Sequence, residues 1–143
     1  MSHMVQVVVD AASPGELGQF WIVALGYRQD DPPPGFDTWE EALLSGNIPE
    51  EQWDDAFAIV DPEDRGPRVF FQKVPEPRAG KNRLHLDVRV SDGPADPQKW
   101  DLVQSHVERL IGAGASVIEE RSDRWGGHWM VMADPEGNEF CVT

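Results

Sequence analysis

The sequence has little cysteine and few basic residues, and it lacks a long apolar run. With Cys141 as the single cysteine, it can form neither an intramolecular disulfide nor a multi-thiolate zinc site, and a reducing cytoplasm is favoured. Twelve Lys and Arg stand against 26 Asp and Glu, so the net charge of −14 excludes the basic stripe of a nucleic-acid binder. Apolar runs stay well short of the roughly 18 residues that span a membrane. We therefore expect a cytoplasmic protein that binds neither nucleic acid nor membrane.

Aromatic residues are plentiful, and they indicate a folded core. Six Trp and six Phe accompany 40% hydrophobic residues in a chain of 143, which is more apolar material than a disordered chain carries. This length favours one domain. We expect that domain over residues 5–143, and residues 1–4 resemble an expression-vector remnant.

Most of the negative charge lies in one stretch. Residues 29–64 contain 12 acidic residues and no Lys or Arg. We interpret residues 30–56 as an acidic insertion, anchored by Trp39 and Trp53. It is either a solvated segment that keeps the protein soluble, or a negative wall that attracts a cationic small molecule or a basic partner.

The first half of the chain predicts one helix between short strands. Residues 5–10 read as a buried strand of β-branched residues. Ser13, Pro14 and Glu16 then have the spacing of a capping box, and an apolar stripe continues to a stop at Gly26. Residues 37–44 predict a short helix with Asp37 and Glu40 in capping-box register, and residues 57–60 and 68–72 predict strands.

The second half repeats this order. Strands are predicted over residues 84–90, 116–120, 128–133 and 139–143, with a helix over 100–111. The triplet ending at Asp10 corresponds to the one ending at Asp87, and the Asp-Pro-Glu turn at Asp61 corresponds to the turn at Asp134. The repeat predicts an α+β fold of two βαβββ modules, residues 5–74 and 82–143, whose sheets form a curved mixed surface around a cleft.

Four segments carry a family resemblance: FWIVALGY from Phe20, VFFQKVPEP from Val69, KNRLHLDV from Lys81 and DPEGNEFCV from Asp134. In this order they resemble the vicinal oxygen chelate superfamily, which includes glyoxalase I, extradiol dioxygenases and bleomycin-resistance proteins. The resemblance implies paired βαβββ modules, a homodimer, and a ligand or a divalent metal (Zn, Ni, Mn or Fe) in the cleft.

Strand alternation selects the side chains that face the cleft. Residues 84, 86, 88 and 90 form the apolar side that packs on the helix, which leaves His85 and Asp87 on the cleft side. In the last strand Glu139, Cys141 and Thr143 share the cleft side. The resemblance implies that His85 holds an imidazole-ligand position and that Cys141 stands where relatives have a glutamate.

The resemblance also implies two metal-ligand positions in the first module, and these are apolar here. Val8 corresponds to His85, and Phe70 lies near the position of Cys141, with Gln72 two residues on. A metal would then rely on His85, Glu139 and Cys141, with Gln72 or Asp87 as a further donor.

Two functions are compatible with this cleft. The first is a small-molecule binder without turnover, in which Phe70, Gln72 and Asp87 contact a planar or cationic ligand. The second is a metal-dependent lyase, isomerase or dioxygenase, with Glu139 as base. Without a metal, His85 is the candidate acid or base. Trp125, His128 and Trp129 form either a stacking lid over a planar ligand or an ordinary aromatic hairpin.

Overall fold

The fold consists of two compact units. The computed structural model describes residues 1–91 and 97–143. The first unit comprises Met1–Ile22 and Gly26–Glu76, and the second comprises Val23–Leu25 and Pro77–Thr143. None of the described helices has the length and apolar character needed to cross a membrane.

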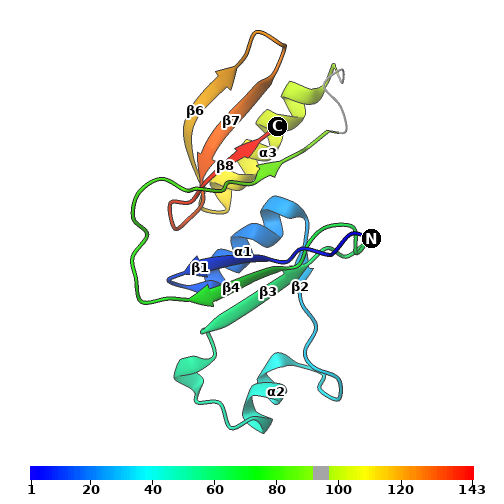
Figure 1. The fold of residues 1–143 in the computed structure, drawn as a ribbon, viewed down its shortest axis with the longest axis vertical. Coiled ribbons are helices and arrows are strands. Elements are labelled where there is room, and N and C mark those ends of the chain that lie inside the picture. Colours follow the sequence, from blue (N-terminus) through cyan, green and yellow to red (C-terminus); the bar gives the residue numbers. More distant parts are fainter. Residues whose placement is uncertain (92–96) are drawn as a thin grey trace. The chain divides into compact units, whose positions relative to one another are not determined.

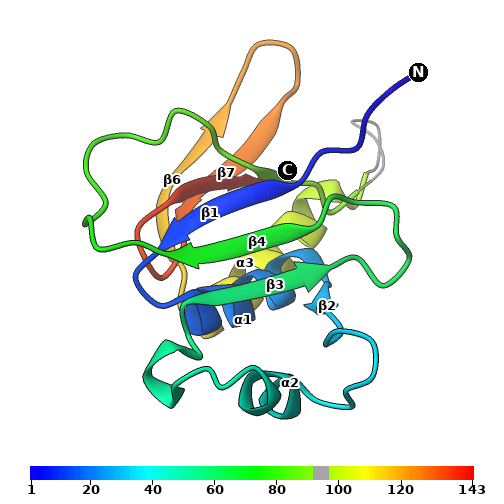
Figure 2. The same ribbon diagram turned by 60° about the horizontal axis from the view of Figure 1, so that its bottom comes forward.

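The first unit is built on a four-stranded mixed sheet. Its strands lie in the order β1-β4-β3-β2, with β1 parallel to β4 and the other pairs antiparallel. Helix α1 lies along one side of this sheet, and α2 lies outside it on the side of β3 and β2 (Figures 1 and 2). The elements are β1 (Val7–Ala11), α1 (Pro14–Leu25), β2 (Arg28–Gln29), α2 (Trp39–Ser45), the 3₁₀ helix η1 (Glu50–Gln52), β3 (Ala56–Val60) and β4 (Val69–Lys73).

The second unit repeats this topology. Its strands lie in the order β5-β8-β7-β6, again with the first and last strands of the unit parallel. The predicted α+β fold with two βαβββ modules is therefore confirmed, and each module forms its own four-stranded sheet. The elements are β5 (Asp87–Val88), α3 (Lys99–Gly112), β6 (Ser116–Ser122), β7 (His128–Ala133) and β8 (Glu139–Val142).

Each sheet has one face closed by apolar side chains. In the first unit Leu17 of α1 and Ile59 and Phe71 of the sheet are completely buried. In the second unit Leu110 of α3 and Met132 of β7 are completely buried as well. Because each such side chain contributes roughly 1.5–3 kcal/mol when buried, these layers hold each helix against its sheet.

Three local predictions need correction. The first strand starts at Val7, and Val8 is 49% exposed, so the strand alternates between exposed residues and residues that are half-buried or, at Ala11, buried. The second module's first strand covers only Asp87–Val88, and Leu84, expected to pack on the helix, is 87% exposed. Helix α2 is capped by Thr38, whose hydroxyl accepts from the Glu41 amide, one residue later than the predicted Asp37 register.

Helix α1 begins and ends at the predicted residues, with an unexpected partner at its start. Ser13 is the N-cap, Pro14 is the first helical residue, and Gly26 ends the helix with a left-handed φ of 70°. The Ser13 side chain makes no capping bond. The Gly15 amide donates instead to the Asp54 carboxylate at 2.7 Å, so the acidic segment supplies the anion that a helix N-terminus attracts.

Candidate functional site in the second unit

The site starts from the parallel pairing of β5 with β8. Asp87 lies directly across from Cys141 in this register, and His85 precedes Asp87 by two residues, with its Nε2 3.3 Å from Asp87 Oδ1. The donor atoms of His85, Asp87 and Cys141 all lie within 4.8 Å of one another. An imidazole, a carboxylate and a thiol therefore meet at one place on the sheet.

The last strand brings the three predicted cleft residues to one cavity. Glu139, Cys141 and Thr143 line it together with His85 and Asp87, and Phe140 lines it as well although it is only 1% exposed. Glu139 faces this cavity, but the group of mutually close donor atoms contains Asp87 in its place.

The cavity has a volume of about 380 Å³, within the usual range of small-molecule sites. Trp129 and Val131 of β7 form its apolar wall. Lys81 and Arg121 bring positive charge to the same cavity, opposite in sign to Asp87 and Glu139, so the lining is close to neutral overall. A ligand here meets hydrogen-bond donors and acceptors beside one aromatic surface.

Arg121 was not predicted as a site residue. It lies directly across from Trp129 in the β6–β7 register, and cross-strand partners share a face of a sheet. The cross-strand pairing with Trp129 is therefore what identifies Arg121 as a residue of the site. A hydrogen bond to the Glu119 carboxylate, and then the negative charge of the same group, raise the pKa of the guanidinium, so its charge is fixed.

The pKa of the Cys141 thiol is raised above its ordinary value. Burial is the main cause that raises its pKa, and the negative charge of Asp87 and a hydrogen bond to that carboxylate act in the same direction. Only 8% of the residue is exposed. A thiol in these surroundings is a poor nucleophile, although a bound cation would reverse the electrostatics.

The three predicted lid residues are not brought together. Trp129 lines the cavity, whereas the His128 ring stacks on Trp100 with centroids 3.3 Å apart and its Nε2 lies 2.6 Å from Glu120. Adjacent strand residues point to opposite faces. Trp125 is 81% exposed, and Figure 1 shows the β6–β7 hairpin extending beyond β8.

Phe70 and Gln72 belong to β4 of the first unit. Gln72 pairs with Asp10 in the parallel β1–β4 register and donates to its carboxylate at 2.8 Å. Asp10 corresponds to Asp87 in the repeat, so Gln72, and not Phe70, takes the place that Cys141 has in the second unit. The prediction was two residues out because the turn after Asp61 is longer than the turn after Asp134.

The donor set fits some metals better than others. An imidazole, a carboxylate and a thiolate can supply three ligands of a tetrahedral zinc ion and leave one position open. A thiolate is a soft ligand that does not suit Mn²⁺. His85 and Asp87 are 55% and 53% exposed, so both are accessible to an incoming ion.

Solved structures with this fold include several of known family. A glyoxalase/bleomycin resistance protein/dioxygenase family enzyme from Burkholderia phytofirmans PsJN superposes with a TM-score of 0.66 at 14% identity, covering 99% of this chain and 97% of that one. A FosX fosfomycin resistance protein variant from Listeria monocytogenes, in complex with Mn(II) and 1S,2S-dihydroxypropylphosphonic acid, has a TM-score of 0.66 at 10% identity, covering 99% and 89%.

TioX from Micromonospora sp. ML1 has a TM-score of 0.53 at 18% identity, with 99% of this chain and 97% of that chain covered. A comparison with curated proteins gives no significant match. The glyoxalase-like domain family matches residues 6–143, nearly the whole chain. The chain therefore belongs to the glyoxalase-like domain family, with the vicinal oxygen chelate fold.

Proposed function

We propose that the protein binds a small molecule with a planar part in the cavity of the second unit. The observation that carries this proposal is the lining of that cavity, with Trp129 beside four charged side chains. Stacking on an indole favours a planar group. Because the charges of Lys81 and Arg121 balance those of Asp87 and Glu139, the lining suits a polar or zwitterionic ligand better than a simple cation.

The test is a ligand screen followed by calorimetry. A panel of aromatic acids, aromatic amines and aromatic amino acids is scored by the rise in Tm, because a ligand at 100 times its Kd stabilises the folded state by about 2.7 kcal/mol. We expect Trp129→Leu to weaken binding of a hit about tenfold. His85→Ala and Glu139→Gln should also weaken it.

Glu108→Gln is the matched control for Glu139→Gln, since Glu108 is an exposed residue of α3 outside the cavity. Its binding should equal that of the wild type. Hits whose affinity is the same in all three cavity variants, or a panel without hits, would contradict the proposal.

A metal-dependent lyase, isomerase or dioxygenase is the second candidate, and the close approach of His85, Asp87 and Cys141 favours it. A divalent ion at these donors would polarise two adjacent oxygens of a substrate. Glu139 lines the same cavity outside the cluster, and we propose it as the base that moves a proton next to the polarised carbonyl.

Metal analysis separates the two candidates. The protein is stripped with a chelator, incubated with Zn²⁺, Ni²⁺, Mn²⁺ or Fe²⁺, and its retained metal is measured. For the enzyme candidate we expect about one equivalent of Zn²⁺, accompanied by proton release from the thiol, and loss of binding in His85→Ala and Cys141→Ser.

Asp87→Asn and Glu139→Gln then identify the third ligand. Loss of zinc in Asp87→Asn alone supports the cluster seen in the structure, and loss in Glu139→Gln alone supports the set expected from the sequence. Absence of retained metal would remove the enzyme candidate and leave the binder.

The family resemblance also leads us to propose a homodimer, and the single cysteine leads us to propose a cytoplasmic location. Light scattering coupled to size-exclusion chromatography tests the first proposal. A mass near the 16.0 kDa of one chain would contradict it.

A further inference from the structure

A second pocket lies in the first unit, between the sheet and the acidic segment of residues 30–56. Its volume is about 240 Å³, and it is lined by Trp39 and Leu43 of α2, Trp53 after η1, and Phe70 of β4. This is less than the 300–1,000 Å³ typical of drug-sized ligands. The space therefore suits one ring or two fused rings, in surroundings richer in aromatic groups than the cavity of the second unit.

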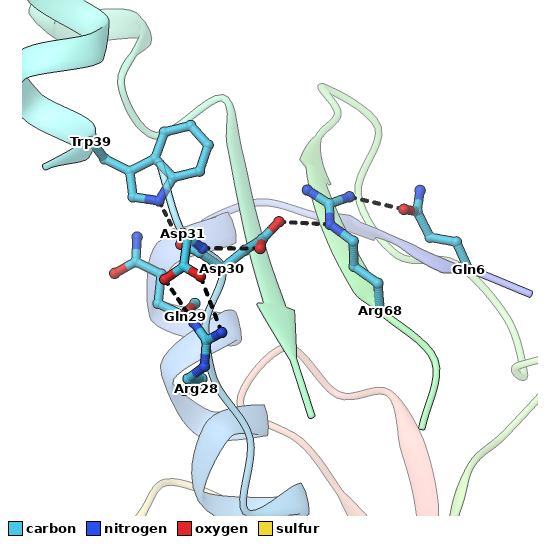
Figure 3. Close-up of polar contacts among 7 residues, drawn as sticks. All are labelled: Gln6, Arg28, Gln29, Asp30, Asp31, Trp39 and Arg68. Atoms are coloured by element: carbon cyan, nitrogen blue, oxygen red, sulfur yellow. Dashed lines mark hydrogen bonds and ion pairs between the residues drawn. The ribbon is translucent and has the colours of Figure 1, made fainter. Parts of the chain in front are cut away.

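Both indoles of the pocket are held by hydrogen bonds to backbone carbonyls. Trp39 Nε1 donates to Asp30 O at 2.7 Å, and Trp53 Nε1 donates to Ile48 O at 3.0 Å. Figure 3 shows the Trp39 contact. Both bonds join residues within the acidic segment, so they fix the two indoles relative to the backbone of that segment. Because the N–H groups are already used, the rings offer their faces to a ligand in fixed positions.

Among the described residues, Arg68 is the one cationic side chain that lines this pocket, and it is already paired. Arg68 Nε donates to Asp30 Oδ2 at 2.8 Å, and its Nη1 donates to Gln6 at 2.8 Å, as Figure 3 shows. Its guanidinium carbon lies 5.5 Å from the centre of the Phe70 ring. Arg68 therefore acts as a fixed wall whose charge is matched by Asp30.

The remaining charge in the pocket lining is negative. Asp55 lines the pocket as an exposed residue, and no salt bridge within the described parts of the chain involves it. It stands in a segment, residues 30–56, that has nine acidic residues and no Lys or Arg. Such a segment raises the local concentration of cations at low ionic strength.

From these contacts we infer that the pocket binds a planar aromatic group that bears a positive charge. The ring lies against the two indoles and Phe70, where aromatic contacts and cation–π attraction add to burial. The charged end lies toward Asp55. This site is additional to the proposed cavity of the second unit and requires neither His85 nor a metal.

Tryptamine and indole-3-propionate test this inference, because they share the same ring and carry opposite charges. We expect calorimetry at low salt to show tryptamine binding about tenfold tighter than indole-3-propionate, with the difference shrinking as salt is added. Equal binding of the two probes, or tighter binding of the acid, would overturn the inference.

Asp55→Asn changes the charge at nearly constant shape. It should weaken tryptamine binding about fivefold and leave indole-3-propionate unchanged. Glu51→Gln is the matched control, since Glu51 is an exposed carboxylate of the same segment that does not line the pocket, and it should bind like the wild type. If Asp55→Asn and Glu51→Gln weakened tryptamine binding equally, binding would depend on the net charge of the chain and not on Asp55, and the inference would be overturned.

Ala56→Leu tests the location without removing an anchoring residue. Ala56 is an exposed residue of β3 that lines the pocket, so a larger side chain should occupy the space and reduce binding of tryptamine at least about tenfold. The far-ultraviolet circular dichroism spectrum checks that the variant is folded. Binding that survives Ala56→Leu and is lost in His85→Ala would assign tryptamine to the second unit and refute a site here.

Discussion

One row of side chains crosses the sheet of the second unit and sets the chemistry of Cys141. Glu119, Val131, Cys141 and Asp87 are consecutive partners from β6 to β5. The thiol therefore lies between an apolar neighbour and a carboxylate. Burial and the charge of Asp87 both favour the protonated form, which makes this thiol suitable as a metal ligand only when a cation replaces its proton.

Labelling of the single cysteine tests this description directly. We expect iodoacetamide at neutral pH to modify native Cys141 at least about tenfold more slowly than the chain unfolded in guanidinium, where the thiol pKa is near 8.5. Mass spectrometry gives the rates without ambiguity because the sequence has no other cysteine. Equal native and unfolded rates would contradict the raised pKa.

The same shift has a consequence for stability. A pKa that is higher in the folded state means that the folded state retains its proton longer, so the stabilising contribution is complete below the unfolded pKa and is lost as pH rises through the folded pKa. As the pH rises above about 8.5, the Tm of the wild type should therefore fall relative to the Tm of Cys141→Ala.

At the scale of residues, the sequence could predict which side chains share a face of a strand, but not which residues pair across neighbouring strands. Period-two alternation predicted that Glu139, Cys141 and Thr143 share one side of the last strand, and all three line the cavity, together with Phe140. It could not show that Asp87, rather than Glu139, is the closest carboxylate to Cys141, because that depends on which residues pair across β5 and β8. Pairing between distant strands follows from turn lengths, and the first module's longer turn moved Gln72 into the position expected for Phe70.

At the scale of elements, a glycine in α1 determines how closely the helix approaches β3. Gly18 is buried, and a Cβ built on it would lie 2.2 Å from the Phe57 ring. Glycine in a helix interior ordinarily costs about 1 kcal/mol relative to alanine. Glycine stands at position 18 despite this cost because any side chain there would collide with Phe57 and prevent the close approach of α1 and β3.

Substitution of two helical glycines should therefore give opposite results. Gly18→Ala should lower the free energy of unfolding by about 1–3 kcal/mol, because the Phe57 ring must move. Gly112→Ala, at the end of α3 where nothing lies within 4 Å of the new Cβ, should stabilise by up to about 1 kcal/mol. Urea unfolding measures both, and a stabilised Gly18→Ala variant would show that the helix can shift away from β3.

Local sequence signals predicted helix ends well and short strands poorly. Ser13, Pro14 and Gly26 mark α1 as the structure has it, since each acts through its own backbone geometry. The Asp54 contact to Gly15 joins residues 39 apart in sequence, and no local pattern indicates it. Strand β5 is shorter than predicted because its pairing with β8, rather than its apolar pattern, limits it to Asp87–Val88.

At the scale of the whole molecule, the internal repeat was the most informative feature of the sequence. Both predicted Asp-Pro turns have the same construction: Asp61 accepts from the amide of Glu63, and Asp134 accepts from the amide of Glu136. For Asp61, these backbone donors also lower the pKa of the carboxyl. Two copies of one design therefore explain the equal strand orders, whereas the acidic segment interrupts only the first copy, between β2 and β3.

The net charge of −14 makes a prediction for the whole chain. Carboxylates that accept hydrogen bonds, such as Asp54 and Asp134, keep these contacts when salt is added. Repulsion between exposed carboxylates, in contrast, is screened, because the Debye length falls from about 30 Å at 10 mM salt to about 8 Å at 150 mM salt. We expect Tm to rise by a few degrees over this range.

A combined Glu40→Gln, Glu50→Gln and Glu51→Gln variant, with three fewer negative charges on exposed residues, should show a higher Tm at low salt and a smaller rise of Tm with salt. A Tm that falls with salt would mean that attractive ion pairs such as Arg68–Asp30 outweigh the repulsion within the acidic segment.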